Sequence, residues 1–339
     1  MLSDAIDVGG SAMNVQNLIW LLIALTGAVD YALLKSLGMS VVVEPGAAIL
    51  FLALLCLTAL FDRYLPSVSR LTRAFAQLMA FAEVGGWLTY AAMAASPFPL
   101  ADKMLSHADA ALGFDWVAWY DWVQAHPLFE QVLSIAYGSI PYQLVALLFC
   151  ACYADTKRVD ELIIAAILSG AAVSIGMVFF PAIGAWTQHG IGRIEPWRQD
   201  ILALRDHAIL TVDHTQGIVT FPSFHTVCAV LLANTVRGRK LFIPILLVNV
   251  AMIVSVMSEG AHYGVDMLGG LVVAWLSIVA SRWLIGNCES WDLGWQTQPA
   301  EQLLGLAATC RQWVRPSPRT ALIKPSANRR KIMRGETVL

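Results

Sequence analysis

The chain has 339 residues, of which 58% are hydrophobic and only 14% charged, and its mean hydropathy is +0.63. A soluble domain carries about 25% charged residues, so a single water-soluble core could not hide this much apolar surface. The net charge of −2 gives no basic bias for binding nucleic acid. Lipid is the alternative solvent, and helices suit it because each closes its own backbone hydrogen bonds. The composition therefore predicts an all-α, polytopic transmembrane helix bundle.

Apolar runs along the chain are long enough to predict individual spans, since a spanning helix needs about 20 mostly apolar residues. About eight candidates follow in chain order: 16–36, 42–61, 74–95, 128–153, 161–181, 223–237, 241–257 and 264–285. The sixth is short. Gly138 and Pro141 predict a kink in the fourth.

Basic residues gather in the loops after the second, fourth and sixth predicted spans and in the tail. The positive-inside rule then places these loops and both termini in the cytoplasm. Four parts follow: N-terminal transmembrane helices (1–96), an outward interfacial segment (97–127), a transmembrane core with the candidate site (128–286) and a basic cytoplasmic tail (287–339).

The predicted outward segment is acidic and carries Trp116, Trp119 and Trp122 at a spacing of three. This spacing puts the three rings on one side of a helix that lies flat at the membrane interface, with the rings at headgroup level. Two interpretations stay open, a simple anchor and a lip over a lipid-entry cleft.

The first block of residues suited to binding or catalysis is 221–225, at the start of the sixth predicted span. Pro222 fits the start of a helix. The free N–H groups of a first helical turn favour an anion. Ser223 adds a hydroxyl donor to them and His225 adds a titratable ring.

A second block places His262 four residues before Asp266, hence on one helical face. A carboxylate beside an imidazole fixes its tautomer and raises its basicity, as a nucleophilic or basic histidine requires. Three arginines lie in the outward loop that precedes the first block, against the positive-inside bias: Arg193, Arg198 and Arg205. An anionic ligand would explain them, because a guanidinium grips phosphate bidentately.

These blocks resemble the type 2 phosphatidic acid phosphatase superfamily, whose pattern is Lys-x6-Arg-Pro, Pro-Ser-Gly-His and Ser-Arg-x5-His-x3-Asp. The second element is matched by Pro222, Ser223 and His225, with Phe224 in place of Gly. The third is matched by Ser255, His262 and Asp266, with Val256 in place of Arg. For the first element, Arg198-x6-Arg205-Asp206 keeps the spacing and two positive charges. The forms of the blocks are closer to the branch that contains inositol phosphorylceramide synthases. The motif resemblance covers about residues 180–285.

The resemblance implies a two-step mechanism without metal or cofactor, in a bundle with a six-helix phosphatase-type core. His262 would attack phosphorus, Asp266 would hold its ring, and His225 would protonate the leaving oxygen. The phosphoryl oxygens would be bound by Arg205 and Ser223, with Arg198 as a helper. The substrate would be a membrane lipid phosphate or phosphodiester, and the acceptor water, an alcohol or a lipid.

Two other functions remain open from the sequence. One is a non-enzymatic anion or lipid transporter, since intramembrane charges also mark transport paths. The other is a metal-dependent hydrolase with His262 and Asp266 as ligands, although no His-Glu-x-x-His motif accompanies them. The expected location is a bacterial inner membrane, with the site facing the non-cytoplasmic side.

Overall fold

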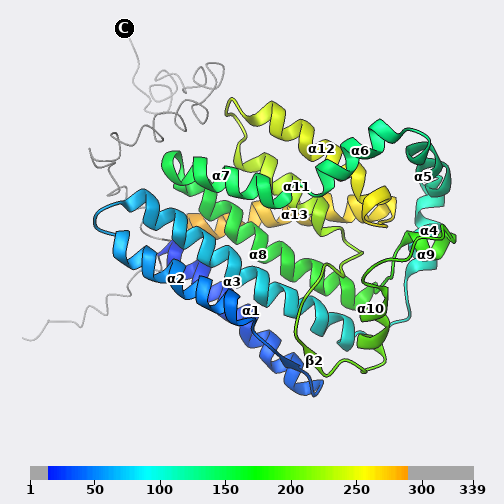
Figure 1. The fold of residues 1–339 in the computed structure, drawn as a ribbon, viewed down its shortest axis with the longest axis horizontal. Helices are drawn as coiled ribbons and strands as arrows, with labels where there is room; N and C mark the ends of the chain where they lie inside the picture. The colour runs from blue at the N-terminus through cyan, green and yellow to red at the C-terminus, as the bar shows by residue number, and fades with distance from the viewer. Residues whose placement is uncertain (1–13, 289–339) are drawn as a thin grey trace, which may run out of the picture.

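The computed structural model describes residues 14–288, and this part of the chain is an almost wholly helical bundle (Figure 1). The helices are α1 (Val15–Ser36), α2 (Pro45–Phe61), α3 (Pro66–Ala95), α4 (Asp102–Ala111), α5 (Trp116–Gln124), α6 (Pro127–Tyr137), α7 (Ile140–Ala154), α8 (Thr156–Phe179), α9 (Ala185–His189), α10 (Arg198–Arg205), α11 (Phe224–Thr235), α12 (Phe242–Glu259) and α13 (Gly264–Gly286). One short parallel pair joins β1 (Ser40–Val41) to β2 (Thr211–Val212). The predicted all-α polytopic class is confirmed; the tail from 289 onward lies outside the described residues.

Each predicted span coincides with helical structure, but fewer helices are long enough to cross a membrane than the eight predicted. Five qualify by length and composition within the described residues: α1, α3, α8, α12 and α13. A sixth is the pair α6 and α7, which bends by 51° at Gly138 and Ser139, so the predicted kink is confirmed. α2 has 17 residues and α11 only 12. At 1.5 Å per residue α11 covers about 18 Å, less than the hydrocarbon thickness of about 30 Å.

The centre of the bundle is an apolar cluster contributed by α1, α3, α7, α8, α11 and α13. Ile19, Ile163 and Val227 are completely buried there. Large apolar side chains such as Leu52 and Trp275 are exposed on the outside of the bundle. A helix that is apolar on all sides fits this position, since one face packs on protein and the other meets lipid.

The two ends of the bundle differ in what they carry. The short helices α4, α5, α9 and α10 gather at one end (Figure 1). At the other end the amide of Gln16, in the first turn of α1, donates to the Asp160 carboxylate over 2.8 Å. Ile285, near the end of α13, belongs to the same cluster as Val15. The first described helix therefore begins, and the last one ends, at the end opposite to the short helices.

The tryptophans of the predicted interfacial segment do not share one exposed face, and the interpretation of all three as anchors is wrong for Trp116. Trp116 is only 2% exposed, whereas Trp122 is 46% exposed. The ring of Trp116 lies between those of Tyr120 and His189, at centroid distances of 5.3 and 5.1 Å. These ring contacts bury Trp116 in the protein.

Candidate active site

His262 lies in the loop that joins α12 to α13, and backbone bonds hold this loop on two sides. The carbonyl of Val256 accepts the N–H groups of Gly260 and His262, over 3.0 and 3.1 Å. Ala261 adopts the left-handed region with φ of 51°. Its carbonyl accepts the N–H of Ala185 over 2.7 Å. Main-chain hydrogen bonds alone thus hold the His262 loop in place.

The imidazole of His262 meets the carboxylate of Asp266 on the first turn of α13. The distance from Nδ1 to Oδ2 is 3.1 Å, and the side chains are 3% and 0% exposed. The same Oδ2 accepts the backbone N–H of Tyr263 over 2.8 Å. A carboxylate at Nδ1 favours the tautomer with its proton there and leaves the Nε2 lone pair free. Burial lowers the pKa of His262 to about 4, against a smaller opposite effect of a hydrogen bond to the Thr220 backbone.

His225 is brought to the same place by the start of α11. The N-cap is Ser223, whose hydroxyl accepts the N–H of Thr226 over 3.3 Å. The N–H of Ser223 donates to the Asp266 carbonyl over 3.1 Å. This bond ties the start of α11 to the start of α13. The rings of His225 and His262 then lie edge to face with centroids 6.5 Å apart.

Tyr137 belongs to this group, although the sequence blocks do not contain it. Its ring stacks on His225 at a centroid distance of 4.2 Å. A Cβ added to Gly260 would lie 2.9 Å from the Tyr137 hydroxyl and 2.9 Å from Cδ2 of His262. The tyrosine and both histidines therefore border one small space. The sequence signal for Tyr137 is its position directly before Gly138, where the kink is predicted.

The three arginines lie in or near α10 and not beside the two histidines of the site. Nη2 of Arg205 donates to the Phe98 carbonyl over 2.6 Å. The guanidinium of Arg193 lies over the Trp186 ring at 4.1 Å. Among the described residues, no hydrogen bond joins any of these arginines to either histidine. A buried Nε of Arg198 and a buried Nη1 of Arg205 have no hydrogen-bond partner in the described chain, so each keeps an N–H group for an anion.

Asp109 holds the N-terminus of α13 and was not predicted as a site residue. Its two carboxylate oxygens accept the N–H groups of Gly264 and Val265, each over 2.8 Å. A carboxylate at a helix N-terminus is favourable because it satisfies free donors and opposes the helix dipole. Burial nevertheless raises the pKa of Asp109, against these two hydrogen bonds.

Asp102 also accepts backbone N–H groups, but from the segment before α9 and not from the start of α13. Its carboxylate accepts the N–H groups of Ile183 and Gly184, over 3.1 and 2.9 Å. It also accepts the hydroxyl of Tyr263 over 2.9 Å. Asp102 and Asp109 are seven residues apart and so lie on one face of α4. The spacing of seven residues is visible in the sequence. Because the acidic segment was predicted to face water, however, buried carboxylates were not expected there.

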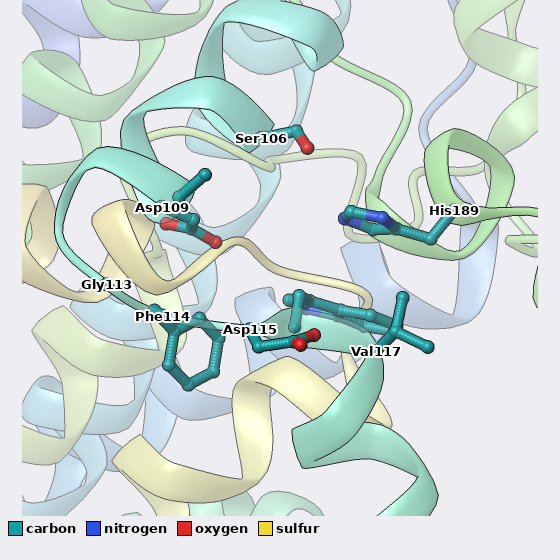
Figure 2. A pocket seen from close by; sticks show the side chains of 9 residues that line it. Ser106, Asp109, Gly113, Phe114, Asp115, Val117 and His189 are labelled. Atoms are coloured by element: carbon teal, nitrogen blue, oxygen red, sulfur yellow. The ribbon is translucent and has the colours of Figure 1, made fainter.

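A cavity of about 420 Å³ lies beside Asp109, which is one of its lining residues (Figure 2). Figure 2 shows Asp109 and His189 on opposite sides of it, with Asp115 below. His189 stacks on Trp116, whose indole N–H donates to the His262 carbonyl over 2.9 Å. Burial lowers the pKa of His189, and the two carboxylates oppose this shift. The lining of the cavity thus contacts the His262 loop through its backbone, and His262 is not among the lining residues.

Comparison with known proteins supports a family assignment. The sequence profile of the PAP2 superfamily matches residues 103–280, just over half of the chain. The match begins in α4 and ends in α13, so it includes Asp109 as well as both histidine blocks, while α1 to α3 precede it. No curated protein and no solved structure matches the chain.

Proposed function

The chain belongs to the PAP2 superfamily, and we propose that this phosphatase-type membrane protein transfers a phosphoryl group from a lipid phosphate or phosphodiester through a phosphohistidine on His262. The observation that carries the proposal is the buried pair of His262 and Asp266, with His225 opposite. A neutral, oriented imidazole with a second imidazole across a small space is the arrangement that nucleophilic catalysis requires.

In the first step Nε2 of His262 attacks phosphorus. The P–N bond forms as the P–O bond to the leaving group breaks, and His225, protonated when the substrate is bound, gives its proton to the departing oxygen and becomes neutral. The imidazole of His262 gains positive charge, which the carboxylate of Asp266 balances at Nδ1–H. The low pKa of His262, about 4, keeps the ring neutral and nucleophilic before substrate binds.

In the second step His225 takes a proton from the acceptor, whose oxygen attacks the phosphohistidine. The P–N bond breaks and neutral His262 is restored. Water as the acceptor gives a phosphatase, and an alcohol or lipid hydroxyl gives a transferase. The resemblance to the inositol phosphorylceramide synthase branch favours transfer to an alcohol, as an inositolphosphotransferase would do.

Binding of the phosphoryl oxygens is assigned to the first turn of α11 and to the arginines. Ser223 supplies its hydroxyl at a helix N-terminus, which favours anions. Arg205 and Arg198 each retain a buried nitrogen without a partner in the described chain. Because Val256 is completely buried and replaces the family's arginine, these two arginines are the proposed substitutes.

A lipid as substrate is supported by an apolar cavity of about 290 Å³ beside the site. Phe224, next to His225, lines it together with Phe81, Gly170 and Ile218. Such a surface accepts an acyl chain, and the change from Gly to Phe224 helps to form it. We place the site on the non-cytoplasmic side, because it lies at the end of the bundle opposite to the basic loops.

The experiment is a product screen with purified protein over lipid phosphates and phosphodiesters, with and without an added alcohol acceptor. Wild type should release phosphate or form a new phosphodiester. His262→Ala should lose about a thousandfold or more of the turnover. Asp266→Asn should retain a folded protein but lose most activity, because the amide no longer selects the same tautomer. A labelled phosphoenzyme should be stable in alkali and labile in acid.

The matched control is His214→Ala, because His214 is exposed and, within residues 14–288, its ring pairs only with the neighbouring Asp213. It should keep wild-type turnover. Undiminished turnover in His262→Ala would exclude the mechanism. Lipid or anion movement across vesicles without any product would instead favour a transporter.

A further inference from the structure

A second polar cavity of about 420 Å³ lies at the other end of the bundle. It lies between the start of α8, the end of α11 and the end of α13, and its lining is Asp155, Lys157, Arg158, Glu161, Arg237, Arg282, Ile285 and Gly286. Gly286 is twenty residues beyond Asp266 on one helix, hence about 30 Å from the active site. The cavity therefore takes no part in the phosphoryl transfer proposed above.

The lining carries more positive than negative charge. Its cations are Lys157, Arg158, Arg237 and Arg282, and its acids are Asp155 and Glu161. Asp155 is also paired with a further cation, Arg239, which lies outside the lining. The two acids do not balance the four cations, so the electrostatic potential in the cavity is positive. The low-dielectric walls of a concave site strengthen that potential.

The two acids pair with arginines of the lining, Glu161 with Arg282 and Asp155 with Arg158. Arg282 donates to the Glu161 carboxylate over 2.7 Å and to the side-chain oxygen of Asn234 over 3.0 Å. The amide of Asn234 in turn donates to Glu161 over 2.8 Å. Arg158 donates to the Asn234 carbonyl over 3.4 Å. Guanidinium groups fixed in this way lose less side-chain entropy when they bind an anion.

Arg237 completes the cavity from the turn after α11. It is exposed, and within residues 14–288 no acidic side chain pairs with it. We propose that this cavity binds a phosphate-bearing anion, with Arg237, Arg158 and Arg282 as its ligands. The positive-inside bias explains basic loops at this end, but it does not require that arginines from α8, from α13 and from the turn after α11 converge on one cavity.

Two sources could supply this chemistry. One is the headgroup of an anionic lipid in the adjacent leaflet, since basic pockets between spans bind such headgroups. The other is a soluble phosphate compound. The cavity lies where α8 begins and α13 ends, at the end of the bundle. Both a lipid at the bundle surface and a solute therefore have access to the same guanidinium groups.

The test uses the full-length protein with His262→Ala, so that lipids are not consumed, in neutral detergent. Binding of inorganic phosphate, dioctanoyl phosphatidylglycerol and dioctanoyl phosphatidylcholine is measured by calorimetry. Arg237→Glu in this background should weaken binding of the anionic ligand about tenfold or more, because a charge-assisted contact is lost. The zwitterionic lipid should bind no differently in the two proteins.

The matched control is Lys240→Glu, the same change of charge at an exposed residue that follows Arg237 closely but does not line the cavity. Its affinities should stay within about twofold of the background. Loss with phosphate identifies a soluble ligand, and loss with phosphatidylglycerol alone identifies a lipid. Equal affinities in both variants, or no saturable binding to the background protein, would overturn the proposal.

Discussion

Tyr137 stacks on the imidazole of His225 with ring planes inclined by only 12°. One face of the histidine is therefore covered, while its neighbour His262 lies edge to face against it. A ring held in this way cannot turn freely between substrate and leaving group. Tyr137 is thus a positioning residue for the proposed general acid, supplied by α6 and not by the two histidine blocks.

Tyr137→Phe keeps the stack and should retain activity within about threefold, whereas Tyr137→Ala removes it. The alanine variant should lower kcat about tenfold to a hundredfold with little change in KM, because orientation of the acid matters in the transition state. Steady-state kinetics on the lipid found in the product screen provides the measurement. Equal kcat values for the two variants would contradict the positioning role.

The sequence was sufficient to predict the helical class and the positions of the apolar helices, but it overestimated how many of them are long enough to cross a membrane. Long apolar runs specify a membrane helix by themselves, and Gly138 marked the bend between α6 and α7. Span length was harder to predict. The run at 223–237 includes the N-cap Ser223 and residues beyond Thr235, where α11 already ends, and hydropathy does not distinguish a helix from its flanking turns.

The site was predictable where chemistry follows local spacing, and not where it depends on tertiary contacts. His262 and Asp266 meet because one helical turn separates them. Asp109 reaches Gly264 only because α4 packs beside the start of α13, a contact between residues more than 150 positions apart. Trp116 likewise seemed interfacial because its partners His189 and the His262 carbonyl are far away in the chain.

Asp109→Asn should destabilise the loop around His262. An amide presents only one acceptor where two backbone N–H groups now meet carboxylate oxygens. The cost should be roughly 1–3 kcal/mol, seen as a lower Tm and reduced turnover. Asp121→Asn is the control, since Asp121 is an exposed residue of α5. Unchanged Tm and turnover in Asp109→Asn would refute this role.

Gly260→Ala should abolish activity without a comparable loss of folded protein. The added Cβ would lie 2.8 Å from the Val256 carbonyl and 2.9 Å from the His262 ring, so the loop must shift. A displacement of about 1 Å can cost a hundredfold in rate. Gly286→Ala is the comparison, because nothing lies within 4 Å of its added Cβ and the residue is far from the active site. Equal turnover of the two variants would show that the loop adapts freely.

Stability should fall in acid through His262. Its pKa is lowered from 6.5 to about 4 by burial, so between these values the unfolded chain binds the proton more readily than the folded protein. The contribution is fully present above pH 6.5 and is lost as the pH falls through 4, on the order of 3 kcal/mol in all.

The comparison for this prediction is His262→Gln, which keeps a neutral polar side chain but cannot titrate in this range. The Tm of wild type should drop more between pH 7 and pH 4.5 than that of the variant, as measured by thermal unfolding in detergent at constant ionic strength. A wild-type decrease no larger than that of His262→Gln would mean that His262 takes up its proton equally well in both states. The imidazole would then not be held neutral by burial, and the proposed nucleophile would lose one of its physical supports.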